Sequence, residues 1–231
     1  SPQGKLLEFN MQEVTIPGRS TDTVRFTPFI YGTNANKWEP GAKNPPLYKV
    51  MLFTRRDGAY REYMPLKIGF GKTELVDGRL TRFDKELKLV KAGYNAAADR
   101  KTTLAELKAL KAKGNNTICP DYPQPGWFYD LCDELGLYVI DCANINAPEK
   151  RDDRKVGGTP SNDPSLADEY LERVKAMYYR SRNHSCVIAF ALGGESGNGY
   201  NMYKAYEWLK SVEKSRPVIC CLLYTSDAAD E

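Results

Sequence analysis

The apolar residues of this chain follow two different periods, and the change of period divides the sequence. From Leu6 to about Leu80, apolar and polar residues partly alternate, which predicts β-strands. These strands are expected at residues 7–16, 23–31, 47–55 and 60–70, separated by turn sequences rich in Pro, Gly and Asn. Short strands at this spacing predict an antiparallel β-sandwich over residues 1–77, small or incomplete with only four strands.

After Asp77-Gly78 short apolar runs alternate with helical patterns. The predicted strands are residues 87–94, 116–119, 137–143, 186–192 and 217–219, and the predicted helices between them begin at Thr103, Gly126, Asp163 and Asn201. Thr103 and Glu106 have the spacing of a capping box, in which the two side chains bond the first free amides of a helix. Gly114 and Gly136 suit the ends of the first two helices. Alternation of this kind predicts a parallel sheet.

Two parallel arrangements are compatible with this alternation: an open doubly wound sheet and the first half of a (β/α)8 barrel. A dinucleotide-binding sheet carries G-x-G-x-x-G after its first strand. Neither GYNAAADR nor GGESGNG has that spacing, and the second sequence carries an acidic residue where a pyrophosphate would be repelled. The sequence therefore favours a partial TIM barrel over residues 78–220, in which the chemistry belongs at the carboxyl ends of the strands.

Charge and cysteine usage exclude several functions. The 33 basic and 30 acidic residues nearly balance, and no basic stripe with interleaved aromatics suggests nucleic acid. No run approaches the ~18 apolar residues of a membrane span. The six cysteines form no C-x-x-C pair and His184 is the single histidine, so no metal site and no cofactor are predicted. Oligomeric state and localisation are not determined by these features.

Both ends of the chain have unusual sequences. It opens with SPQGK, without a methionine or an apolar signal segment. Residues 221–231 resemble the in-frame translation of a transposon adapter used in preparing sequencing libraries, so a non-native tail is expected there. We therefore expect a fragment that is cut at both ends.

The carboxyl ends of the predicted barrel strands carry amide and carboxylate side chains that would meet at one mouth. They are Asn95, Asp121, Asn144, Gly194, Glu195 and Ser196. Such groups bind the hydroxyls of sugars, and Glu195 could protonate a departing glycosidic oxygen. Phe190 and Ala191 would partly desolvate that carboxylate and raise its pKa. Side chains in place of Gly193 or Gly194 could obstruct the bend. The alternative is that these polar residues only cap helices and bond loops.

The positions of Trp127 and Trp208 on predicted helices favour packing in the core over stacking on a sugar. For Trp38 either role is possible.

Four stretches of the chain resemble glycoside hydrolase family 2, the β-galactosidase and β-glucuronidase group. They are residues 127–145, 180–199 and 205–218, together with PPLYKVML and IGFGKTELVDG between residues 45 and 78. The resemblance implies that an immunoglobulin-like domain precedes the barrel. It also implies a retaining hydrolase with a carbohydrate substrate and two catalytic glutamates. Glu195 falls on the family's acid/base, and the nucleophile belongs to a later strand that this chain lacks.

The chain departs from the family pattern at several site positions. Gly194 replaces the asparagine that contacts the sugar 2-hydroxyl, and Cys142 replaces a glutamate of the third strand. Further departures are Ala96, Ala97, Ile118 and Asp121 where the family has Arg or His, and Asn146 and Pro148 where β-galactosidases hold magnesium. They argue against a standard β-galactosidase specificity and against the metal. Two hypotheses remain: a divergent glycosidase, inactive as this fragment, or a catalytically silent barrel that binds carbohydrate or serves as a scaffold.

Overall fold

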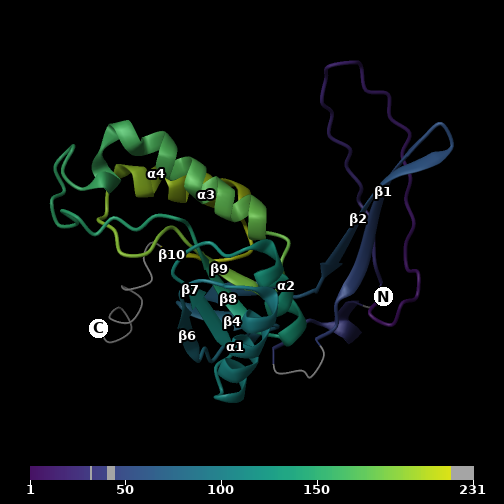
Figure 1. Ribbon diagram of the computed structural model, residues 1–231, viewed down its shortest axis with the longest axis horizontal. Coiled ribbons are helices and arrows are strands. Elements are labelled where there is room, and N and C mark those ends of the chain that lie inside the picture. Colours follow the sequence, from purple (N-terminus) through teal and green to yellow (C-terminus); the bar gives the residue numbers. More distant parts are fainter. Residues whose placement is uncertain (32, 41–44, 220–231) are drawn as a thin grey trace.

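Five parallel strands form the central sheet of the molecule (Figure 1). The structure is a computed structural model that describes residues 1–31, 33–40 and 45–219; the predicted tail at 221–231 lies outside them. The strands are β6 (Lys91–Tyr94), β7 (Thr117–Pro120), β8 (Tyr138–Cys142), β9 (Val187–Ala191) and β10 (Val218–Ile219). The helices between them are α1 (Arg100–Ala112), α2 (Gly126–Leu135), α3 (Ala167–Ser181) and α4 (Tyr200–Val212).

The order of the strands identifies the sheet as part of a barrel. Each strand pairs in parallel with the next one along the chain, in the order β10-β9-β8-β7-β6. A doubly wound sheet reverses its order at a switch point, whereas a TIM barrel adds its strands in sequence. All residues of β8 and β9 are buried, as expected for strands covered on both faces. The predicted partial TIM barrel is thus confirmed.

The helix ends agree with the sequence at Gly114, Gly136 and Pro164 and differ at the start of α1. Gly136 has a φ of 66° and closes α2, and Pro164 opens the 3-10 turn η3 (Pro164–Leu166) before α3. The capping box at Thr103 is wrong. Asp99 caps α1 by accepting hydrogen bonds from the amides of Lys101 and Thr102. The bond from the Thr102 hydroxyl, followed by those from the two amides, lowers the pKa of the Asp99 carboxyl. An aspartate at the end of the preceding loop was therefore the better signal.

The region before the barrel contains two small antiparallel sheets. Strands β1 (Tyr48–Arg56) and β2 (Ala59–Ile68) form a hairpin, while β3 (Thr73–Val76), β4 (Arg79–Arg82) and β5 (Lys85–Glu86) form a three-stranded sheet. The hairpin turns at Asp57-Gly58 and Asp77-Gly78 have positive φ at both residues, the conformation that twisted two-residue turns require. The domain boundary expected at Asp77 thus coincides with the turn between β3 and β4.

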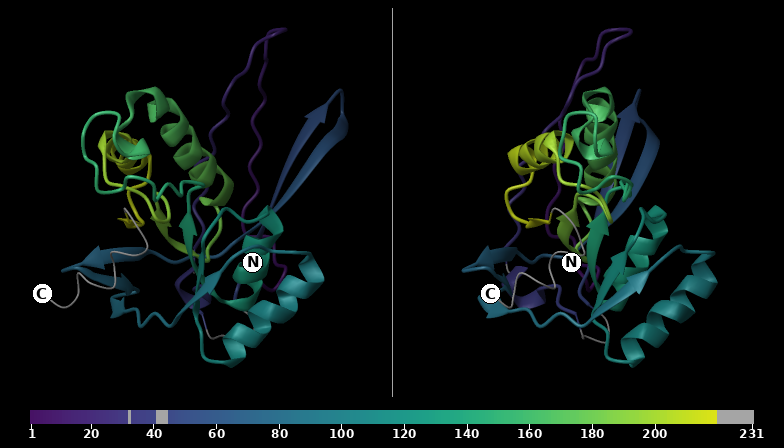
Figure 2. Two further views of the ribbon diagram at one scale, coloured as in Figure 1. Left: turned by 60° about the vertical axis from the view of Figure 1, so that its left-hand side comes forward. Right: turned by 90° about the vertical axis from the view of Figure 1, so that its left-hand side faces the viewer.

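The strands predicted at residues 7–16 and 23–31 are wrong, because the structure has no strand in either segment. Instead the chain runs as an extended arm beside the β1–β2 hairpin, and both project away from the barrel strands (Figures 1 and 2). No sandwich forms among the described residues. Apolar alternation makes a strand only when a neighbouring strand takes up the backbone hydrogen bonds, and neither of these segments has such a partner in the structure.

Trp38 joins this region to the amino-terminal side of the barrel. Its ring is fully buried against Tyr138 at the start of β8, and its Nε1 donates to the Asp133 carbonyl oxygen at 2.9 Å. The Arg82 guanidinium lies over the same ring and donates to the Trp38 carbonyl oxygen. Burial lowers the pKa of Arg82. A Cβ at Gly69 would lie 2.5 Å from the Trp38 side chain, so only glycine permits this packing. Trp38 is therefore a core residue.

Three short 3-10 turns complete the structure: η1 (Thr33–Asn36), η2 (Pro160–Asn162) and η3. Helices α3 and α4 pack together along one side of the sheet (Figure 1). Trp127 and Trp208 are partly buried against the main core, which confirms their predicted packing role. Within the described residues, none of the helices combines the length and the apolar character that crossing a membrane would require.

Candidate active site

The candidate site lies beyond the carboxyl ends of β8 and β9, where the two chains continue side by side. The Ala143 amide donates to the Ala191 carbonyl, and the Gly194 amide donates to the Ile145 carbonyl at 2.8 Å. The Ala147 amide then donates to the Glu195 carbonyl at 2.8 Å. These bonds extend the parallel pairing past the regular strands, so the backbone that carries Glu195 is held on a fixed path.

The carboxylate of Glu195 is half-exposed and faces a guanidinium. Its side chain is 46% exposed, and Oε1 lies 3.0 Å from Nη1 of Arg151 in the loop between β8 and α3. Phe190 and Ala191 are fully buried in β9. The Glu195 side chain is not enclosed with them, so the expected burial of its carboxylate is not seen.

The two glycines before Glu195 differ in the room they leave. A Cβ at Gly193 would lie 2.8 Å from the Ile145 carbonyl oxygen, a distance that requires the backbone to shift. A Cβ at Gly194 would meet Asn146 and Ile145 at 3.8 Å, which is ordinary van der Waals contact. The close approach of the two chains thus requires glycine at 193, while position 194 can accept a side chain. The prediction of steric obstruction holds for Gly193 alone.

Ser196 and Asn144 take part in holding the loops. The Ser196 side chain is buried, and its hydroxyl accepts a hydrogen bond from the Ala147 amide at 3.2 Å. Asn144 is exposed after β8, and its carbonyl oxygen accepts from Nη1 of Arg173 on α3 at 2.6 Å. Substrate contact by either residue stays a prediction, with Asn144 the more accessible of the two.

Asn95 and Asp121 follow β6 and β7 and are both exposed. Gln124, which the sequence did not point out, joins the two loops: its Nε2 donates to the Asn95 carbonyl at 3.0 Å and its Oε1 accepts from the Ala97 amide. The Asp121 amide donates to the Tyr94 carbonyl. The same edge of the sheet therefore presents all six predicted residues, as the parallel register requires.

Two further contacts at this edge were missed by the sequence reasoning. Asn146 Nδ2 donates to the Tyr122 hydroxyl at 3.0 Å and so links the loops after β7 and β8. Arg151 belongs to the charged run KRDDRK, whose spacing matches no motif. Pairs of this kind join residues 24 and 44 positions apart, so local sequence patterns contain no signal for them.

Below the site, the fully buried carboxylate of Asp141 anchors the end of β8. Its Oδ1 accepts from the Tyr129 hydroxyl at 2.6 Å, and its Oδ2 accepts from Ser181 Oγ at 2.6 Å and from Arg180 Nη2 at 2.9 Å. Burial, followed by the negative charge of Asp141, raises the pKa of Tyr129 well above its ordinary value. The network connects β8 with α2 and α3 just before the chain reaches Cys142 and the mouth.

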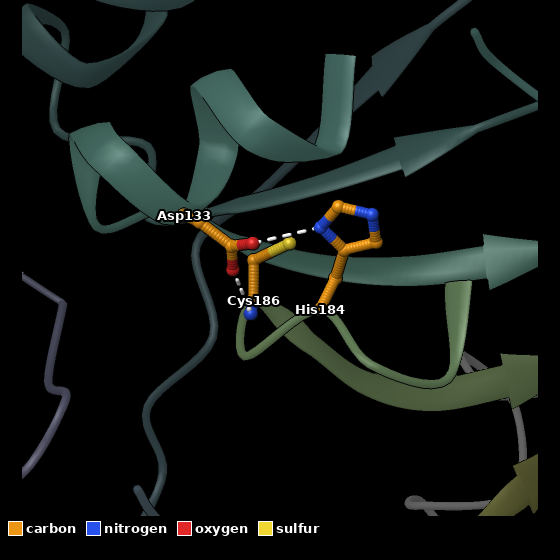
Figure 3. Close-up of side chains that lie close together, drawn as sticks. All are labelled: Asp133, His184 and Cys186. Atoms are coloured by element: carbon orange, nitrogen blue, oxygen red, sulfur yellow. Dashed lines mark hydrogen bonds and ion pairs between the residues drawn. The ribbon is translucent and has the colours of Figure 1, made fainter. Parts of the chain in front are cut away.

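A second cluster, of Asp133, His184 and Cys186, lies at the opposite edge of the sheet (Figure 3). Their ligand-type atoms are within 4.8 Å of one another. Asp133 Oδ2 bonds His184 Nδ1 at 2.8 Å, and Oδ1 accepts from the Cys186 amide at 2.7 Å. Burial raises the pKa of the Cys186 thiol well above its usual range. Through the two hydrogen bonds of Asp133, the cluster ties α2 to the start of β9.

The residues near Glu195 do not fit the magnesium ion that the family resemblance implies. The Pro148 side chain has no ligand atom, and Asn146 offers a neutral amide oxygen in place of a carboxylate. The positive charge beside Glu195 comes instead from Arg151, at 3.0 Å. A second cation at this carboxylate would meet the guanidinium, so we derive no chemistry through a metal.

Comparison with known proteins agrees with this architecture. Residues 94–230 match the family described as "Glycosyl hydrolases family 2, TIM barrel domain". The chain is 34% identical over 185 residues to a β-galactosidase of Vibrio cholerae and 36% identical over 190 residues to a β-galactosidase of Lactococcus lactis. Each alignment covers 75% of this chain but 18% of the relative. The chain therefore spans less than a fifth of the length of these relatives.

Among solved structures, the β-glucuronidase of Parabacteroides merdae has the same fold. It aligns with a TM-score of 0.62 and 20% identity, covering 79% of this chain and 24% of that one. The family match spans more than half of the sequence, so the chain belongs to glycoside hydrolase family 2. Within that family it is similar to the β-galactosidases named above, which are glycosidases.

Proposed function

We propose that the polypeptide carrying this chain hydrolyses the O-glycosidic bond of a β-linked, galactoside-like carbohydrate, with Glu195 as the acid/base. The position of Glu195 supports this role best. It follows β9 at the carboxyl edge of a family 2 barrel, on a backbone that the Ala147 amide holds in place. Active sites of TIM barrels lie at that edge.

In the proposed mechanism, Glu195 first protonates the leaving oxygen and later takes a proton from the attacking water. A second carboxylate about 5–5.5 Å from the first would attack the sugar and give retention of configuration. We place that nucleophile outside the 231 residues, on a later barrel strand, and expect this chain alone to be inactive. Arg151 contacts Oε1 of Glu195, so the glycosidic oxygen would approach Oε2 or take the place of the guanidinium.

The domain arrangement that goes with this function is also a proposal. Residues 78–220 would be the first half of the catalytic barrel, and residues 1–77 would belong to an immunoglobulin-like domain. The apolar side chains of the β1–β2 hairpin, such as Met51 and Met64, are exposed here, as a strand pair lacking its partner sheet would be.

The test measures hydrolysis of a chromogenic β-galactoside by the complete polypeptide. Glu195→Gln keeps the shape of the side chain but removes the acid, so we expect the rate to fall at least ~100-fold, the lower end of general-acid contributions. Glu149→Gln, at an exposed glutamate in the loop after β8, is the matched control and should leave the rate within twofold of the parent. Equal rates for Glu195→Gln and the parent would refute the assignment.

A silent carbohydrate-binding barrel is the second candidate, and the departures at the site favour it. Gly194 offers no amide side chain to a sugar hydroxyl, and Cys142 is buried where the family has a glutamate. A complete polypeptide that binds galactosides but releases no chromophore under any tested condition would support this candidate over the enzyme.

A further inference from the structure

A cleft of about 410 Å³ opens close to Glu195 along the chain. It lies between the loop that joins β8 to α3 and the first turn of α4, and its lining residues are Arg154, Asn162, Asn198, Gly199, Tyr200 and Tyr203. Asn198 follows Glu195 by three residues, and Arg154 follows Arg151, the partner of Glu195, by three residues. The two segments that meet at the Arg151–Glu195 ion pair therefore also form the walls of this cleft.

Hydrogen bonds between the two walls hold the cleft open in one shape. Asn162 Nδ2 donates to the Arg154 carbonyl at 2.9 Å, and Asn162 Oδ1 accepts from the Tyr200 amide at 3.2 Å. A Cβ at Gly199 would lie 2.4 Å from the Ser161 carbonyl oxygen, so the walls approach as closely as glycine permits. These contacts fix the positions of the two walls of this shallow, open cleft relative to each other.

The lining combines aromatic rings with a cation. Tyr200 and Tyr203 are each 56% exposed, which leaves ring surface for stacking on a sugar. In the described part of the chain, the Arg154 guanidinium has no ion pair. Glu207 bonds the Tyr203 hydroxyl and is paired with Lys204 at 3.0 Å, and Lys204 Nζ lies 5.4 Å from the centroid of the Tyr200 ring.

The backbone adds to this positive field. Helix α4 has no acidic residue in its first turn, so the positive end of its dipole is not neutralised there. A planar guanidinium with free donors recognises carboxylate and sulfate groups in two-point contacts. Aromatic faces, an Asn198 amide and an unpaired arginine together suit a sugar that carries a negative charge.

We propose that this cleft is a subsite for an acidic sugar unit, carboxylated or sulfated, of a glycan held at the candidate active site. That the ligand is a carbohydrate rests on the proposed function. That the cleft prefers a negatively charged sugar rests on Arg154. The ring stacks on Tyr200 or Tyr203, and its carboxylate or sulfate pairs with the guanidinium.

The test is binding of three oligosaccharides to the 231-residue chain, measured by isothermal titration calorimetry. The probes are a galacturonic acid tetrasaccharide, a sulfated galactose tetrasaccharide and neutral galactotetraose. We expect whichever acidic probe fits to bind at least ~10-fold more tightly than the neutral one, because only an acidic group can form charge-assisted hydrogen bonds with Arg154 on both sides of the contact. A difference between the two acidic probes identifies which group the cleft takes.

Variants separate the cleft from general charge. Arg154→Gln should weaken binding of the preferred acidic probe about 10-fold and leave the neutral probe unchanged. Lys155→Gln removes the same charge from the exposed neighbouring residue and should change the affinity less than twofold. Arg154→Lys keeps the charge but loses the two-point contact, so its affinity should lie between those of the parent and of Arg154→Gln.

Three results would overturn the proposal: equal binding of acidic and neutral probes, equal losses in Arg154→Gln and Lys155→Gln, or no binding of any probe. The outcome is independent of hydrolysis, since binding is measured on the 231-residue chain, which is expected to be inactive. If the complete polypeptide hydrolyses no galactoside but the 231-residue chain binds the acidic probe, the proposed hydrolysis fails and the subsite stands. Conversely, if the complete polypeptide hydrolyses the galactoside but the chain shows no preference for acidic probes, the subsite is refuted and the proposed hydrolysis stands.

Discussion

Strands β8 and β1 show how differently similar apolar sequences end up in this molecule. β8 reads YVIDC and all five residues are buried, whereas β1 reads YKVMLFTRR and most of its residues are exposed. β8 has a neighbouring strand on each side and packs against α2 and α3, while β1 pairs with β2 alone. An apolar run therefore predicts a strand, but burial depends on whether other layers exist to cover it.

The extended arm before the hairpin also leaves apolar side chains exposed because no layer covers them. Phe29 and Tyr31 are 70% and 84% exposed, although their sequence alternates as a strand would. Apolar surface of this extent normally faces a partner. The barrel region thus contains its own core, and the amino-terminal region contains the apolar side chains of a core without a second layer.

If stability resides in the barrel region, the largest loss should come from Asp141→Ala. The substitution leaves the Arg180 charge without its buried partner and removes the bonds of Tyr129 and Ser181. Removing one partner of a buried ion pair typically destabilises by about 3–5 kcal/mol. Urea unfolding followed by circular dichroism measures the change. A loss below about 1 kcal/mol would show that the network contributes little.

Alkaline pH should destabilise the barrel region, because its buried tyrosines resist ionisation in the folded state. Burial raises the pKa of Tyr138 to about 12 from 10, although Arg82 acts in the opposite direction. Because the folded-state pKa lies above the unfolded value, the contribution is present below pH 10 and is lost as the pH rises to about 12. Two pKa units correspond to at most about 2–3 kcal/mol.

Urea unfolding at a series of pH values from 8 to 12 measures this loss. Tyr138→Phe should flatten the decline, and Tyr63→Phe, at an exposed hairpin position, should not. If the free energy of unfolding of both variants falls with pH as steeply as that of the parent, Tyr138 is not the group responsible.

The smallest effect is expected for Leu52→Ala in β1. Leu52 is 45% exposed on the hairpin, so its truncation should change the free energy of unfolding by less than about 0.5 kcal/mol. Leu131→Ala is the same substitution at a buried position of α2 and should cost about 2–5 kcal/mol. Similar losses at the two positions would mean that the hairpin is covered in solution, which would remove the contrast between the regions.

Much of the barrel could be predicted because its signals are local. Gly136 ended α2 as expected, and the apolar runs at 137–143 and 186–192 contain β8 and β9. The capping box predicted at Thr103 and Glu106 was wrong because Asp99 caps the helix four residues earlier. At the site, parallel strands brought the predicted residues to one edge, but neither the Arg151–Glu195 pair nor the role of Gln124 had a local signal.

By itself the sequence determined the alternation of strands and helices, the family and the placement of Glu195 after the fourth barrel strand, because these depend on period, turn residues and order along the chain. Only the tertiary structure decided that Trp38 is a core residue, that residues 7–16 and 23–31 form no strands, and that Glu195 faces Arg151. Those outcomes depend on contacts between distant segments. A residue's own sequence neighbourhood does not encode which surface will be available to cover it.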